Sequence, residues 1–127
     1  MHQSKEISNN RGSFARHQVS FKRSLEATID KYALDAEFNI EKTCHELLLS
    51  RASLYRKILK YYGCSFTDLL MEYRIEKARE YLVLGLSISE VTYKIGYSDP
   101  SYFVKIFRKR VGITPGEFRE RSNYDVT

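Results

Sequence analysis

Apolar residues recur along most of the chain at intervals of three and four positions, which is the period of one face of an amphipathic α-helix. In the segment 19–32, for example, Phe21, Leu25, Ile29 and Tyr32 fall on one such face. No stretch favours a β-strand, and both prolines stand where a helix would begin. The pattern therefore predicts an all-α fold.

Capping residues and glycines divide this pattern into separate helices. Asn39, Ser50 and Asp99 precede helical segments and are of the types preferred at N-caps, while Ser87 and Glu90 form a capping box. Glycine follows four of the segments, where its tolerance of left-handed backbone is typical of a helix end. The seven predicted helices span residues 19–32, 40–47, 51–62, 67–84, 88–95, 100–111 and 115 to about 122.

Two pairs of predicted helices repeat each other. The first pair is 40–47 with 51–62, and the second is 88–95 with 100–111. The matching positions, 49 residues apart, are Leu54 with Phe103, Arg56 with Lys105, Ile58 with Phe107 and Gly63 with Gly112. The offset is 48 in the first helix of each pair, so the second turn is one residue longer. Two short helices joined by a tight turn are a helix-turn-helix unit.

The segment 67–84 separates the two units. Its 18 residues would form a rod of about 27 Å, against about 34 Å between successive major grooves on one face of a duplex. With the widths of the packed units added, we expect a monomer to contact two adjacent grooves. The predicted organisation is a flexible leader (1–17), a first helix-turn-helix subdomain (18–65), a linker helix (66–85), a second helix-turn-helix subdomain (86–122) and a tail (123–127).

Positive charge is concentrated on the second helix of each pair. The chain has a net charge of +5, and residues 51–60 and 100–112 each hold four basic residues and no acidic one. Six acidic residues lie between positions 21 and 50, and four more lie between 66 and 85. Two basic helices of similar pattern favour nucleic acid as the partner.

The apolar positions divide each basic helix into an inner and an outer face. The outer stripes are Ala52, Tyr55, Arg56 and Leu59 in the first helix, and Ser101, Val104, Lys105 and Arg108 in the second. Such side chains suit the major groove, where Arg and Lys bind guanine and apolar groups such as Ala52 or Val104 contact the thymine methyl. Flanking basic residues and the N–H groups at the helix starts suit phosphates.

Several other classes of protein are disfavoured. No run of 18 apolar residues is present, and the polar start of the chain lacks the apolar stretch of a signal peptide. Cys44 and Cys64 give neither a disulfide framework nor a metal-ligand spacing, so we expect a cytoplasmic, nucleoid-associated protein with no cofactor. An enzyme is disfavoured because no nucleophile–base pair, metal-ligand set or phosphate-binding loop is present.

Three stretches of the chain have the form of known signatures. The longest, ISEVTYKIGYSDPSYFVKIFRKRVGITPGEFR at residues 88–119, looks like a second helix-turn-helix signature almost throughout. RIEKAREYL at 74–82 looks like a linker helix, and LSRASLYRKI at 49–58 looks like a first unit. Together, over about residues 20–122, they resemble the DNA-binding domain of the AraC/XylS-type transcription regulators.

The resemblance implies DNA contacts from the start and middle of segments 51–62 and 100–111. The candidate DNA-binding residues are Arg51, Ala52, Ser53, Tyr55, Arg56, Lys60, Ser98, Asp99, Pro100, Ser101, Val104, Lys105, Arg108 and Lys109. Because Pro100 and Val104 cannot donate to a base edge, the second helix is expected to contribute mostly phosphate and shape contacts. The sequence departs from the family at Leu48, where Gly is usual, and at Thr92, where Ala is usual. The first turn is therefore expected to be strained or differently shaped.

The resemblance further implies a regulator that binds a specific duplex site of bacterial promoter type and activates transcription, with RNA polymerase as a partner. It also implies an upstream sensor domain in a longer parent chain. From the residues alone, the alternative is a helical protein-interaction module with a non-specific basic face. Affinity for duplex DNA that falls steeply with added salt would distinguish DNA binding from this alternative.

Overall fold

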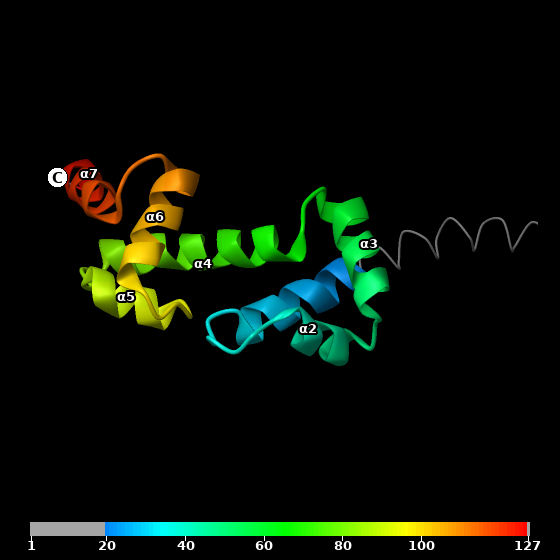
Figure 1. The fold of residues 1–127 in the computed structure, drawn as a ribbon. Coiled ribbons are helices and arrows are strands. Elements are labelled where there is room, and N and C mark those ends of the chain that lie inside the picture. Colours follow the sequence, from blue (N-terminus) through cyan, green and yellow to red (C-terminus); the bar gives the residue numbers. More distant parts are fainter. Residues whose placement is uncertain (1–19, 127) are drawn as a thin grey trace, which may run out of the picture.

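In a computed structural model, residues 20–126 of the chain are described, and they form an all-α fold without strands (Figure 1). The described helices are a first helix over residues 20–32, α2 (Ile40–Leu47), α3 (Arg51–Tyr62), α4 (Phe66–Val83), α5 (Ile88–Lys94), α6 (Pro100–Val111) and α7 (Pro115–Val126). The prediction of seven helices is confirmed. The leader expected at residues 1–17 lies outside the described part of the chain.

The N-caps that the sequence predicts are present. The Asn39 side chain accepts from the Lys42 N–H at 2.9 Å, and the Ser50 hydroxyl accepts from the Ser53 N–H at 3.1 Å. At the start of α5 the side chain of each capping-box residue bonds the backbone N–H of the other. These bonds satisfy donors that a helix start would otherwise leave unpaired, and they fix the residues at which helices of both helix-turn-helix units begin.

The end of α7 differs from the prediction. The helix continues to Val126, so the end expected near Ser122 was wrong. The Ser122 hydroxyl donates to the Phe118 carbonyl at 3.0 Å, so this polar residue is accommodated on the helix and does not stop it. Neither glycine nor proline follows Ser122 in the sequence, so no residue that commonly ends a helix is available.

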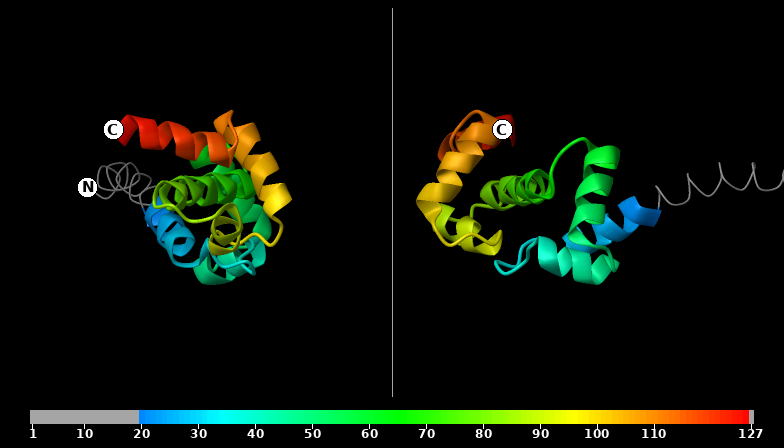
Figure 2. Two further views of the ribbon diagram at one scale, coloured as in Figure 1. Left: turned by 90° about the vertical axis from the view of Figure 1, so that its left-hand side faces the viewer. Right: turned by 45° about the vertical axis from the view of Figure 1, so that its right-hand side comes forward.

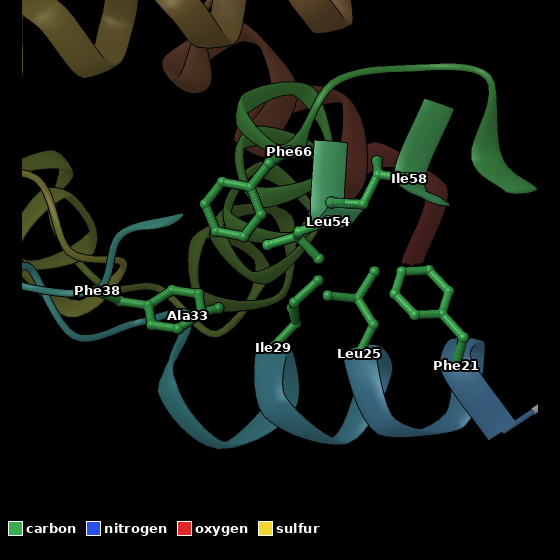
Figure 3. Close-up of a cluster of buried hydrophobic side chains, with 8 residues drawn as sticks. All are labelled: Phe21, Leu25, Ile29, Ala33, Phe38, Leu54, Ile58 and Phe66. Carbon is green, nitrogen blue, oxygen red and sulfur yellow. The ribbon is translucent and has the colours of Figure 1, made fainter. Parts of the chain in front are cut away.

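Two hydrophobic cores lie at opposite ends of α4. The first, shown in Figure 3, contains Phe21, Leu25, Ile29, Ala33, Phe38, Leu54, Ile58 and Phe66. The second contains Ile75, Ala78, Leu82, Val91, Ile95, Phe103, Ile106 and Phe107. Leu54, Ile58, Phe103 and Phe107 are completely buried, which confirms the predicted inner faces. Because α4 contributes side chains to both cores, it positions α3 and α6 relative to each other.

Arg74, in the middle of α4, contacts both halves of the molecule. Its side chain is buried, with Nε donating to the Ala33 carbonyl at 2.7 Å and Nη2 donating to the Asp35 carbonyl at 3.0 Å. Its guanidinium also lies 4.9 Å from the ring centre of Tyr97, in the turn before α6. Within residues 20–126 it forms no salt bridge. Backbone carbonyls and an aromatic face therefore stabilise its charge.

The turn of the first unit is strained at Leu48, as the departure from the family predicts. Leu48 has φ 55° and ψ 43°, a left-handed conformation in which the side chain of an L-residue crowds the backbone. The matching position of the second unit is Gly96, with φ 97°. The second departure, Thr92, is accommodated because its buried hydroxyl donates to the Ile88 carbonyl at 2.7 Å.

Replacing Leu48 by glycine is expected to stabilise the protein by roughly 0.5–1 kcal/mol, because glycine adopts positive φ without a steric cost. The leucine side chain is 90% exposed, so little buried apolar area is lost. Urea unfolding monitored by circular dichroism measures the change. Leu48→Ala is the matched control, since it removes the same side chain but keeps Cβ. Equal stability of the two variants would show that backbone strain is absent at this turn.

Candidate nucleic-acid interface

In Figure 1, α6 passes across α4, α3 lies beyond the opposite end of α4, and α3 and α6 run in the same direction. The end-on view in Figure 2 shows α3 and α6 on the same side of α4, with the first helix on the other side. Since α4 has 18 residues, its axis is about 27 Å long. The arrangement therefore presents two parallel helices along one side of the molecule.

The outer face of α6 is basic. Ser101, Lys105, Arg108 and Lys109 are exposed, and Val104 is half-buried. Lys105, Arg108 and Lys109 form no salt bridge with any residue that the structure describes. These three cations are therefore available to an anionic partner.

The start of α6 is fixed by Asp99, which precedes Pro100 at the first helical position. The Asp99 carboxylate accepts from the Ser101 N–H at 3.0 Å, which accounts for its position as a cap. Ser98 is exposed immediately before it, and Pro100 is half-buried. The cap thus fixes where α6 begins, next to the basic stripe, and occupies the Ser101 N–H at the helix start.

The outer face of α3 combines basic and apolar side chains. Ala52, Tyr55, Arg56, Leu59 and Lys60 are all exposed. The Arg56 guanidinium donates to the Ser53 hydroxyl at 3.4 Å, a long contact that leaves its other N–H groups available. Ala52, Tyr55, Arg56 and Leu59 therefore share one exposed face of α3, with Lys60 beside it, while the predicted Ser53 is half-buried.

Arg51, at the start of α3, has an ion pair that the sequence did not predict. Its Nη1 lies 3.1 Å from Oε1 of Glu41 on α2. Both side chains are largely exposed, so the pair is screened by water and its contribution to stability is small. The acidic partner makes Arg51 a weaker candidate for a phosphate contact than the three cations of α6.

Two features beside α6 could not be read from the sequence. A hollow of about 430 Å³ lies between α6 and α4, lined by Met71, Tyr102, Lys105, Ile106, Lys109 and Arg110. Arg110 also forms an ion pair with Asp68 in the first turn of α4, with 3.0 Å between Nη2 and Oδ1. Residues 42 positions apart give no local sequence signal, so only the fold reveals this pair. It ties the C-terminal end of α6 to the end of α4 nearest α3.

The Asp68 pair makes stability dependent on pH in the acid range. Hydrogen bonds from the Arg110 guanidinium and then from Ser65 lower the pKa of the Asp68 carboxyl below its ordinary 3.8. Because the pKa is lower in the folded state, the ionised carboxylate stabilises the protein at pH values above the ordinary pKa. This contribution is lost as the pH falls through the folded-state pKa. Asp68→Asn is therefore expected to be less stable than the unmodified protein near neutral pH, with the difference shrinking as the pH is lowered below the ordinary pKa of 3.8. Urea unfolding at neutral and acid pH measures it, and a difference unchanged by acid would contradict this assignment.

Negative charge gathers on another face of α4. A groove of about 340 Å³ between the first helix and α4 is lined by Glu26, Ile29, Asp30, Tyr62, Leu69, Glu72, Tyr73 and Glu76. On the helical wheel of α4, Glu72 and Glu76 lie far from Met71, which lines the hollow beside α6. Four carboxylates repel phosphate, so this groove is not a DNA-binding surface.

The described residues offer little to other chemistry. No cluster of His, Cys, Asp or Glu within residues 20–126 could hold a metal ion, and the thiols of Cys44 and Cys64 are free. Among the helices of the described part of the chain, none has the length and apolar character needed to span a bilayer.

Comparisons with known proteins match this architecture. A family model described as "Helix-turn-helix domain" matches residues 43–121. The "HTH-type transcriptional regulator GadX" of Escherichia coli O6:H1 is 37% identical over 105 residues, which are 82% of this chain but 38% of that protein. The chain thus corresponds to less than half the length of that relative.

Solved structures show the same fold. A "DNA-binding transcriptional dual regulator" from Escherichia coli K-12 superposes with a TM-score of 0.72 at 33% identity, covering 80% of this chain and 90% of that one. The DNA-binding domain of AdpA, solved in complex with a target DNA, superposes with a TM-score of 0.75, covering 81% and 93%. At 20% identity the second likeness concerns the fold alone. On its sequence and its two helix-turn-helix units, the chain belongs to the AraC-type helix-turn-helix family of DNA-binding transcription regulators.

Proposed function

We propose that this chain binds a specific double-stranded promoter site as a monomer, with α3 and α6 in adjacent major grooves. The observation that supports this most directly is that two parallel, exposed helices lie on one side of α4 (Figure 1). Lys105, Arg108 and Lys109 are exposed on α6 and form no salt bridge with the described residues. A helix-turn-helix places its second helix in the major groove, and successive major grooves on one duplex face are about 34 Å apart.

The side chains divide by the contacts that their chemistry allows. Arg56 on α3 and Lys105 on α6 occupy matching positions on the outer faces and have donors for guanine O6 and N7. Arg108 and Lys109 lie further along α6 and suit phosphates, as does Lys60 on α3. The proposed contact surface is completed by six smaller or uncharged residues: Ala52, Ser53, Tyr55, Ser98, Pro100 and Ser101. Asp99 contributes by capping α6.

The biological output is proposed from family membership. We infer that the chain regulates transcription as an activator and contacts RNA polymerase while bound to promoter DNA at the nucleoid. A sensor domain in a longer parent chain would supply the signal, in keeping with a relative of which this chain matches 38%.

Selection of bound sequences from a random duplex library tests the proposed function. The recovered sites should contain two clusters of fixed bases about one helical turn apart. The logarithm of the affinity should fall linearly with the logarithm of the salt concentration, because cations released from several phosphates drive binding. Absence of duplex binding at low salt would favour the alternative, a protein-interaction module with an incidental basic face.

Arg56→Ala and Lys105→Ala are each expected to weaken binding to the selected site about tenfold, because each removes a proposed base contact. Fluorescence anisotropy with labelled duplex measures the affinity, and circular dichroism checks that helicity is retained. Lys31→Ala is the charge-matched control: it removes an exposed lysine of the first helix, which lies on the other side of α4 (Figure 2), and it should change affinity little. Unchanged affinity in both test variants would overturn these base contacts.

A further inference from the structure

The two proposed recognition helices differ in chemistry at matching positions. On α3, Tyr55 and Leu59 are 57% and 52% exposed. The positions 49 residues later on α6 are Val104, which is half-buried, and Arg108, which is exposed and basic. The outer face of α3 is thus the more apolar of the two, although the units repeat each other in fold.

The apolar side chains of α3 form a continuous stripe. Ala52, Tyr55 and Leu59 follow one another at intervals of three and four residues, so they line one side of the helix beside Arg56. Neither Tyr55 nor Leu59 packs on the first hydrophobic core, although α3 contributes Leu54 and Ile58 to that core. In the free protein, water therefore covers much of this stripe.

The major groove offers one apolar group at the base edges, the C5 methyl of thymine. Covering apolar surface is favourable in proportion to the area removed from water, so Leu59 and Tyr55 gain most where thymine methyls lie against them. A cytosine at the same place presents no methyl group. The apolar stripe therefore discriminates between bases that a phosphate contact could not distinguish.

We propose that α3 recognises thymine methyl groups through Ala52, Tyr55 and Leu59. Recognition by α6 depends on them less, because the half-buried Val104 is the one apolar residue of its outer stripe. This inference rests on the proposed function, since it requires α3 to lie in a major groove. It makes the two half-sites chemically unlike: the α3 half-site is thymine-containing, with Arg56 selecting an adjacent guanine. The α6 half-site is bound through Lys105, Arg108 and Lys109.

The test uses the selected duplex with thymine replaced by deoxyuridine, which removes only the C5 methyl. One half-site is substituted at a time, and affinity is measured by anisotropy. In the α3 half-site each lost methyl contact should weaken binding about fourfold, the effect of exposing one such group. In the α6 half-site the same replacement should change affinity less than about twofold.

Variants at position 59 identify the half-site and the side chain responsible. Leu59→Ala should bind the unmodified duplex more weakly and lose part of the deoxyuridine effect in the α3 half-site only. Leu59→Arg copies the residue of α6 at the matching position, Arg108. This variant should steepen the salt dependence of binding while reducing the methyl dependence, since Ala52 and Tyr55 remain. The position is exposed, so circular dichroism should show both variants folded.

The outcomes separate this inference from the function on which it rests. If a selected duplex binds but deoxyuridine has no effect, or an equal effect in both half-sites, the thymine assignment is overturned and DNA binding stands. A selected α3 half-site that contains no thymine would also overturn the thymine assignment and leave DNA binding standing. If no duplex binds, the proposed function fails and the thymine assignment fails with it.

Discussion

Replacing Arg74 by methionine is expected to lower the free energy of unfolding by about 2 kcal/mol. Methionine has similar length but no donor, so the Ala33 and Asp35 carbonyls lose their bonds of 2.7 and 3.0 Å. A buried acceptor left without a donor costs about 1–3 kcal/mol. Removing a buried charge offsets part of this loss, because its desolvation cost also disappears. The net effect remains destabilising because the buried Ala33 carbonyl loses its side-chain donor, whereas the Asp35 carbonyl still accepts from the Phe38 N–H at 3.1 Å.

Urea unfolding measures the change, with Arg74→Lys as the matched control. Lysine keeps the positive charge, but a single ammonium on a flexible stem cannot reproduce the guanidinium fork or its stacking on Tyr97. Its stability should therefore fall between those of the methionine variant and the unmodified protein. A methionine variant as stable as the unmodified protein would contradict the role assigned to these bonds.

Arg74→Met also has an expected consequence for DNA binding. Because Arg74 contacts both halves of the molecule, its loss should loosen the angle between α3 and α6. One base pair inserted between the half-sites rotates them by about 35° and separates them by about 3.4 Å. The unmodified protein should bind the lengthened site much more weakly than the selected site. For Arg74→Met the affinities for the two sites should differ less. Equal discrimination by both proteins would limit Arg74 to a role in stability.

Gly96→Ala is expected to destabilise the protein by about 3–4 kcal/mol, through backbone strain and a steric clash together. The residue has φ +97°, and a Cβ atom there would lie 2.9 Å from Nη2 of Arg74 and 3.1 Å from the Leu34 carbonyl oxygen. The backbone oxygen has little freedom to move, and displacing the guanidinium would strain its bonds to Ala33 and Asp35. The cost therefore exceeds that of left-handed backbone alone.

Gly112→Ala is the matched control, because Gly112 has φ +94° and a Cβ atom there would meet nothing within 4 Å. Only the backbone cost of about 1–2 kcal/mol should appear in that variant. Thermal unfolding of the two variants in parallel isolates the contribution of the contact with Arg74. Equal destabilisation would mean that the turn around Gly96 relaxes without cost.

Local signals predicted most of the fold. The caps Asn39, Ser50 and Asp99 act within four residues of the helices that they begin, so their effect is visible in sequence. The burial of Phe103 and Phe107 followed from helical period alone. The end of α7 was missed because a run of polar residues resembles a helix end, whereas Ser122 bonds back to its own helix.

Contacts between distant residues were beyond sequence reasoning. The members of the outer stripes on α3 and α6 were predicted together, because the residues of each stripe lie on a single helix and follow its period. The hydrogen bonds of Arg74 to residues 39 and 41 positions away were not predicted, and neither was the ion pair of Arg110 with Asp68. Both depend on how two units pack on α4, which no periodicity encodes. The role assigned to each stripe residue on DNA stays a prediction.

The separation of charge across α4 has a consequence for how the protein meets its target. Carboxylates of the groove beside the first helix lie on one face, while Lys105, Arg108 and Lys109 lie along another. This distribution gives the molecule an electric dipole moment, so the field of a polyanion exerts a torque on it before any contact forms. Approaching molecules would turn their cationic side toward the duplex, and a larger share of collisions would be productive.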